Sequence, residues 1–175
     1  MMKKVFKLYF AWADDAEAKW LTSMSKKGWG LKSYKWGLYT FEKITPANYI
    51  YRLDYQASLK DDREEYYSIF HEAGWEHAAE FNGWQYFRRP AEDHAETPDI
   101  YSDLPSKVQK YHSLSLLIFL LTLPALGIFL SIILPSDYGS VNAVKWIFPL
   151  CLAFNLIAIG CLQLKRRSLM KNPLS

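Results

Sequence analysis

Seven residues of this sequence have side chains that together could bind a small molecule. They are aromatic rings and charged groups at alternating positions of short segments with β-strand character. A ring face attracts a cation, and a carboxylate beside the ring attracts it in the same sense. The set therefore predicts a site for an organic, amphipathic cation. The candidate residues are Tyr9, Glu42, Arg52, Asp54, Trp84, Tyr86 and Arg88.

Two other interpretations of these residues stay open. Lys7, Arg52 and Arg88 would neutralise the carboxylates in exposed ion pairs, which contribute little to stability. The rings would then fill the core of a small domain, as the 7 Trp, 12 Tyr and 10 Phe of the chain favour. A surface for a protein partner is also rich in aromatic residues. An open cleft lined by rings favours a ligand, whereas a flat or filled sheet face favours an interaction protein.

Other reactive side chains are scattered along the chain. The histidines have no cysteine or carboxylate at ligand spacing, so we expect no metal site. The sequence has no Gly-x-Ser-x-Gly elbow and no glycine-rich phosphate loop. A net charge of +3 over 175 residues does not indicate nucleic-acid binding. We therefore expect a protein that is not an enzyme and that carries no cofactor. The histidines are His71, His77, His94 and His112.

An internal repeat determines where the candidate residues lie. Gly28-Trp29 recurs as Gly74-Trp75, 46 residues later, and Phe41 aligns with Phe87 at the same offset. Upstream of the first helix the offset is 45, so that Val5 aligns with Ile50. A fixed offset over most of a domain indicates two copies of one structural unit.

Each copy has the pattern strand, helix, strand, strand. Asp14 followed by Glu17 is typical of a helix-capping box, and Ser58 with Asp61 repeats the pattern. Each helix is expected to end at a glycine, the usual left-handed stop. Gly37 and Asn82-Gly83 mark the hairpin turns. The expected strands are 5–10, 29–36 and 38–43 in the first copy, and 49–56, 75–81 and 84–89 in the second.

Alternation within the first strand of each copy assigns its two faces. Phe6, Leu8 and Phe10 are expected to pack on the helices, as are Tyr51, Leu53 and Tyr55. The candidate ligand-binding residues would share the opposite face. The predicted fold is thus α+β: a duplicated βαββ module, with two helices on one face of an antiparallel sheet, in residues 1–90.

The C-terminal part, residues 111–175, has the composition of a transmembrane helical hairpin. Residues 113–134 and 146–164 contain no charged side chain and are long enough to cross a hydrocarbon core of ~30 Å. A short turn-forming segment separates them. Pro124 is expected to kink the first helix, and Gly127 with Ser131 to allow close helix contact. Asn155 is expected to bond the partner helix or to belong to a polar pathway.

The flanking charges predict the orientation in the membrane. Lys107 and Lys110 precede the first span, and four basic residues follow the second, whereas the connecting loop carries only Asp137 and Lys145. Positive residues favour the cytoplasmic side. We expect a multi-pass protein of the cell membrane with both termini cytoplasmic and no signal peptide. Residues 91–110 form an acidic linker that contains prolines.

The chain resembles the uncharacterised bacterial DUF2812 family. The resemblance is carried by three segments, at residues 4–10 (Lys-Val-Phe-Lys-Leu-Tyr-Phe), 17–21 (Glu-Ala-Lys-Trp-Leu) and 28–29 (Gly-Trp). It implies a membrane-anchored protein, often encoded beside PadR-type regulators, and thus a regulatory role. The duplicated module is also similar in architecture to gyrase-inhibitor-like effector-binding domains, which implies a small amphipathic ligand. A protein partner or a second copy of the chain is the alternative.

Overall fold

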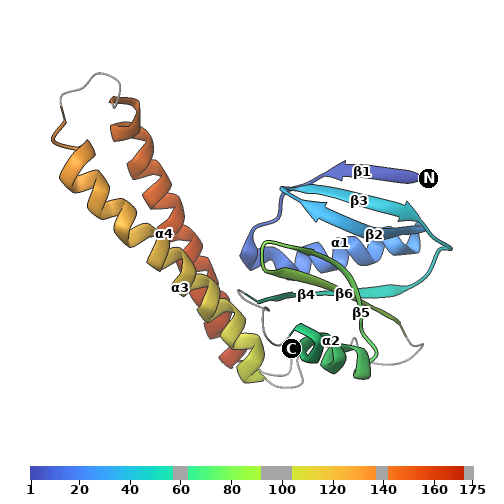
Figure 1. Ribbon diagram of the computed structural model, residues 1–175. Coiled ribbons are helices and arrows are strands. Elements are labelled where there is room, and N and C mark those ends of the chain that lie inside the picture. Colours follow the sequence, from blue (N-terminus) through green and yellow to red (C-terminus); the bar gives the residue numbers. More distant parts are fainter. Residues whose placement is uncertain (57–62, 92–103, 137–141, 172–175) are drawn as a thin grey trace. The chain divides into compact units, whose positions relative to one another are not determined.

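The computed structural model describes residues 1–56, 63–91, 104–136 and 142–171 (Figure 1). Two compact units divide the chain, Met1–Ser102 and Asp103–Ser175. The predicted capping box at Ser58 and most of the predicted linker lie outside the described residues. The elements of the first unit are β1 (Met2–Phe6), a 3-10 turn (Ala11–Ala13), α1 (Asp14–Lys26), β2 (Trp29–Lys35), β3 (Leu38–Lys43), β4 (Tyr49–Tyr55), α2 (Arg63–Glu72), β5 (Glu76–Phe81) and β6 (Trp84–Pro90).

The two halves of the first unit have the same local structure. Each half forms an antiparallel three-stranded sheet with its last strand in the centre, in the orders β1-β3-β2 and β4-β6-β5. Each sheet shifts register at the same repeat position, between Leu31 and Ser33 and between His77 and Ala79. Both hairpins turn through two residues of positive φ, at 36–37 and 82–83, which fits the twist of a two-residue hairpin. The predicted α+β fold and its strand–helix–strand–strand order are confirmed.

The arrangement of the layers differs from the single sheet that the sequence suggested. Helix α1 lies between the two sheets, and α2 lies on the far side of the second sheet (Figure 1). Leu21 of α1 shares one buried cluster with Phe41 of the first sheet and Tyr51 of the second. A second cluster joins Ile50 and Phe87 to the rings of α2. The layers are therefore sheet, helix, sheet, helix.

This stacking overturns the predicted faces. Val5 and Ile50 face the helices of their own modules, whereas Phe6 and Leu8 are 67% and 64% exposed. Tyr51 is buried, as expected, but against α1 rather than α2. Alternation alone did not indicate which face each helix covers, because Val5 and Ile50 share their faces with the charged residues Lys7, Arg52 and Asp54.

The second unit is a pair of packed helices. It comprises α3 (Leu104–Ile128), a π-helical turn (Phe129–Ile133) and α4 (Asn142–Lys171). Phe129 and Phe148 stack with ring centroids 4.3 Å apart, and Gln163 Nε2 donates to Ser115 Oγ at 3.1 Å. Within the described residues, the segments Val108–Ile133 and Asn142–Lys171 are long and apolar enough to cross a membrane.

Candidate functional site

A small pocket opens between the two sheets at the N-terminal end of α1. It contains about 40 Å³, which is room for a few water molecules at the ~10–15 Å³ that each needs. Three of the predicted ligand-binding residues, Tyr9, Trp84 and Tyr86, line it together. The remaining lining residues come from the segment before α1, from the first turn of α1 and from β2. They are Phe10, Ala11, Asp14, Glu17 and Tyr34.

Glu17 is the central polar residue of this pocket. Its side chain is 6% exposed, and its Oε1 accepts hydrogen bonds from the hydroxyls of Tyr39, at 2.6 Å, and Tyr86, at 2.9 Å. Within the described residues no lysine, arginine or histidine forms an ion pair with it. Lys7 Nζ, on the segment before the helix, lies 4.8 Å from the ring centroids of Tyr9 and Trp20. A buried carboxylate without a counter-charge is costly, and it favours either protonation or a bound cation.

The local sequence explains why Glu17 is at this place. Helix α1 begins at Asp14, after Ala13, and no side chain caps its first turn, so the predicted capping box is wrong. Glu17 therefore does not cap the helix. Its side chain lies between the two sheets and bonds Tyr39 and Tyr86. The helix presents it one turn before Leu21, which is fully buried. A polar group is thus held at the end of an apolar helix face.

Burial controls the protonation of this carboxyl. Loss of solvent raises the pKa of Glu17 above its usual value of 4.5, and the negative charge of Asp14 adds to the rise. The hydrogen bonds from Tyr39 and Tyr86 act in the opposite sense and are the smaller effect. Asp14, itself 4% exposed, lines the same pocket. The pocket therefore concentrates negative charge among rings whenever Glu17 is ionised.

The other four predicted residues lie apart from this pocket. Asp54 is directly opposite Gln85 in the register of β4 and β6, and it therefore shares a face with Gln85 rather than with Tyr86. It accepts hydrogen bonds from the Tyr66 hydroxyl, at 2.9 Å, and from the Tyr55 amide. Arg52 donates to the carbonyl of Tyr51. The bond from Tyr66 joins α2 to β4, whereas the other two contacts lie within β4.

Glu42 and Arg88 belong to ion pairs on the surface. Glu42 lies 3.8 Å from Lys32, with both side chains about half exposed. Arg88 Nε donates to Glu76 at 2.9 Å, and its guanidinium lies 5.0 Å from the ring centroid of Tyr49. The predicted grouping of carboxylates with Trp84 and Tyr86 on one face is therefore not formed by these residues. Glu17 and Asp14 are the carboxylates that accompany the rings.

Sequence reasoning missed Glu17 because a helix-start pattern explained it. One signal in the sequence did point to it: the residue is a carboxylate one turn before a run of apolar helix positions, so its side chain faces the same way. Tyr34 was missed as well, because the register shift in β2 alters the alternation of that strand. Its ring lies 4.6 Å from Tyr39 and 5.5 Å from Tyr86, between centroids.

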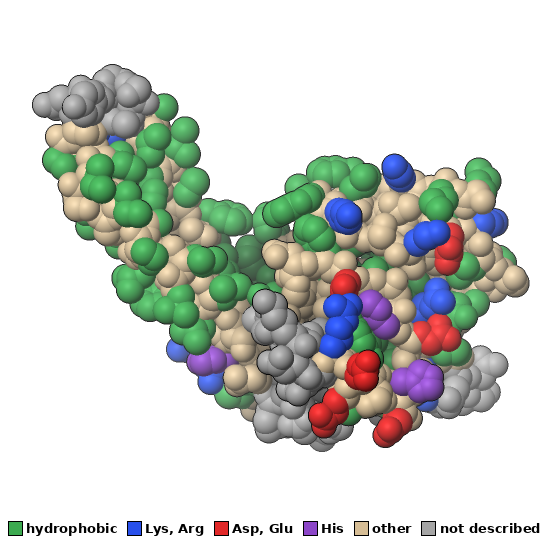
Figure 2. Space-filling view, viewed as in Figure 1, with side chains coloured by type: hydrophobic (Ala, Val, Ile, Leu, Met, Phe, Trp, Pro, Cys, Tyr) green, Lys and Arg blue, Asp and Glu red, His purple; other side chains and the backbone are tan. Residues whose placement is uncertain are grey.

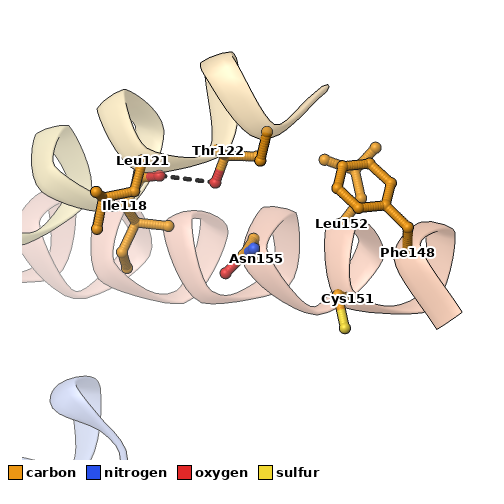
Figure 3. Close-up of a pocket in the computed structure, with 8 residues that line it drawn as sticks. Ile118, Leu121, Thr122, Phe148, Cys151, Leu152 and Asn155 are labelled. Atoms are coloured by element: carbon orange, nitrogen blue, oxygen red, sulfur yellow. Dashed lines mark hydrogen bonds between the residues drawn. The ribbon is translucent and has the colours of Figure 1, made fainter. Parts of the chain in front are cut away.

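A larger cavity of about 300 Å³ lies between α3 and α4 (Figure 3). Thr122 and Asn155 are its polar side chains, and the Thr122 hydroxyl donates to the carbonyl of Ile118 at 2.7 Å. Within the described residues Asn155 has no hydrogen-bond partner, so the expected bond to the partner helix is not formed there. A Cβ added at Gly127 would meet nothing within 4 Å, so the predicted close contact at this glycine is also wrong.

Among the described residues, no three His, Cys, Asp or Glu side chains gather where they could hold a metal ion. The fold and the pocket define a class of protein: a duplicated βαββ domain with a small aromatic and acidic pocket, joined to two long apolar helices. A family model described as "Protein of unknown function (DUF2812)" matches residues 13–123. The chain therefore belongs to the DUF2812 family. No curated protein and no solved structure matches it.

Proposed function

We propose that this chain is a membrane-anchored sensing domain without enzymatic activity, which binds a small organic cation at the Glu17 pocket. The observation that carries the proposal is a buried carboxylate, surrounded by rings, that has no cationic partner among the described residues. Ring faces and a carboxylate attract a cation together, and a partly dry site strengthens both attractions. The two apolar helices support anchoring in the cell membrane. The lysines and arginines that flank them favour a folded domain on the cytoplasmic side.

Ligand entry requires the pocket to open, because about 40 Å³ holds no organic molecule. Trp84 is only half-buried, and its ring packs on Tyr55 with 5.5 Å between centroids. Rotation of this side chain would enlarge the pocket without disturbing the fully buried core. Such a movement would also alter the contact between the two sheets. Ligand binding in the pocket would thereby change the packing of the two modules.

The test is a tryptophan-fluorescence titration of the full chain in lipid nanodiscs. The titrants are organic cations that increase in size from tetramethylammonium. We expect saturable quenching that is lost in Glu17→Gln, which keeps the shape of the side chain and an acceptor for both tyrosines. Glu80→Gln is the matched control, because Glu80 is an exposed carboxylate already paired with Arg63. Absence of saturable quenching in the wild type would reject the sensing function.

The second candidate is an accessory protein that holds a partner, such as a transcription regulator or another membrane protein, at the membrane. The exposed apolar side chains of the first module favour it. In the first unit, the large exposed hydrophobic residues among those described gather on this module, with Ile69 as the exception. Capture of a stable partner by the full chain, combined with no cation binding, would support this alternative.

A further inference from the structure

One face of the first sheet is apolar and uncovered. In the second sheet, the face that carries Tyr51 and Leu53 is buried against α1. The residues of the first sheet that the repeat aligns with them are Phe6 and Leu8, and no described element of the first unit covers them (Figure 1). We call this surface the outer face. Its large apolar side chains are Met2, Phe6, Leu8 and Leu38, with Trp36 at the tip of the adjoining hairpin.

Phe6, Leu8 and Leu38 lie together at the hairpin end of this face. Phe6 lies directly opposite Leu38 in the register of β1 and β3. A Cβ at Gly37 would come within 2.6 Å of Leu8 Cδ2 and 3.1 Å of Phe6 Cε2, so both side chains lie over the hairpin turn. Trp36 precedes that glycine and is 78% exposed, and its ring makes an edge contact with Phe81 of β5, at 5.2 Å between centroids. Apolar patches of this kind on a folded domain usually mark an interaction surface.

The charges on the outer face are mainly positive. Lys4 lies between Met2 and Phe6 on β1, and Lys35 is directly opposite Leu38. Lys32 is exposed beside them, and its neighbour Glu42 is the acidic residue on this face among those described. Hydrophobic and basic side chains lie together along the edge formed by β1 and β3, whereas acidic ones gather below, toward α2 (Figure 2).

We propose that the outer face lies on an anionic lipid surface. Aromatic and aliphatic side chains bordered by lysines are the composition of interfacial membrane-binding surfaces, and tryptophan favours the headgroup level. Lysines near an anionic leaflet add an electrostatic attraction. A second copy of the chain fits less well, since self-pairing of this face would bring two mainly positive surfaces together.

The inference rests on the proposed membrane anchoring. Because the anchor keeps the domain near the bilayer, a small apolar patch would be enough for it to bind the lipid surface. Pro90 ends β6 and Val108 begins the first candidate span, so a fully extended chain between them covers at most ~60 Å. A tether of that length holds the domain near the bilayer at an effective concentration on the order of millimolar. Weak lipid contacts then become populated without high intrinsic affinity.

The experiment uses the full chain in vesicles of phosphatidylcholine with or without phosphatidylglycerol, and measures tryptophan quenching by brominated acyl chains. Trp146, which is 80% exposed on α4, reports insertion of the helices. In anionic vesicles we expect Trp36→Phe to lower the quenched signal by about the share of one tryptophan among 7. High salt should reduce that difference. Phe6→Glu should remove it, whereas Ile69→Glu, at a similarly exposed site on α2, should leave it unchanged.

Each contrary result has its own meaning. Equal quenching of the wild type and Trp36→Phe, with Trp146 quenched, overturns the docking proposal and leaves the anchor intact. No quenching of any tryptophan overturns the anchor and the docking together. A Trp36 contribution that disappears as the protein-to-lipid ratio rises, equally with and without anionic lipid, assigns the outer face to a second copy and overturns the lipid proposal.

Discussion

Tyr39 and Tyr86 come from different modules and donate hydrogen bonds to the same oxygen, Glu17 Oε1. The two sheets are therefore connected through one carboxylate on the helix between them. The arrangement tolerates a neutral acceptor at position 17 as well as a charged one, because a hydroxyl donor bonds either. The charge itself costs free energy in this buried place, and this cost depends on pH.

Glu17→Gln should raise stability at neutral pH. The raised pKa of Glu17 means that the folded state holds a proton more tightly than the unfolded state. Stability therefore falls as pH rises from about 4.5 to the raised pKa, and stays low above it. We expect Glu17→Gln to gain stability at pH 8 and little at pH 3, where Glu17 is protonated in both states. Thermal unfolding at the two pH values measures this, and a gain that is equal at both would contradict it.

Cation binding should strengthen as pH rises. Only the ionised carboxylate attracts a cation, so affinity should increase up to tenfold for each pH unit below the pKa of Glu17 and level off above it. Titrations of the full chain across this range measure the slope. Trp84→Ala should abolish the binding at every pH because it removes a ring from the pocket, and circular dichroism should show that the variant is folded. Binding that does not change with pH would exclude Glu17 as the ligand-binding group.

Gly83→Ala should destabilise the first unit more than Gly74→Ala. Both glycines have positive φ, of 83° and 80°, and an alanine costs about 1–2 kcal/mol there. At Gly83 the new Cβ would also come within 2.8 Å of the Tyr55 ring and 3.0 Å of the Gln56 carbonyl. At Gly74 the nearest atom is 3.6 Å away, on Arg89. Chemical denaturation of the two variants measures the difference, and equal losses would show that the hairpin relaxes.

Asn155→Leu should not weaken the helical pair. The amide has no hydrogen-bond partner among the described residues, and a leucine would fill part of the apolar cavity that it lines. Gln163→Leu, in contrast, loses the bond to Ser115 and should cost about 0.6 kcal/mol, the average for such bonds in membranes. Unfolding in mixed micelles compares the two variants. A larger loss for Asn155→Leu would indicate a polar partner of Asn155 in the assembled protein.

The orientation of the membrane segment has a direct test. In a background without Cys151 and Cys161, a cysteine at position 140 should react with an impermeant maleimide from outside intact cells, and one at position 175 should not. The excess of Lys and Arg at the two ends of the hairpin is the physical reason. Labelling at 175 alone would reverse the assignment and place the folded domain outside.

The sequence predicted local structure better than it predicted which faces are covered. The repeat located the hairpin turns at 36–37 and 82–83, because only a few residue types tolerate positive φ. The repeat did not reveal that α1 would contact two sheets, because alternation separates the faces of a strand without naming the partner of each. Phe6 was therefore assigned to the core, and Asp54 was grouped with Tyr86. Both errors follow from long-range packing, which no local pattern encodes.

Because α1 lies between two sheets, the two halves of this domain differ in how many substitutions they tolerate. Ala18, Leu21 and Met24 belong to a cluster that includes residues of both sheets, so a polar substitution there would disrupt two interfaces. Helix α2 covers only the second sheet and carries exposed glutamates on its other side. A saturation-mutagenesis scan should therefore find α1 intolerant around most of its circumference and α2 permissive over its outward half. Divergence between the two copies would accumulate accordingly, fastest in the helix that has one neighbour.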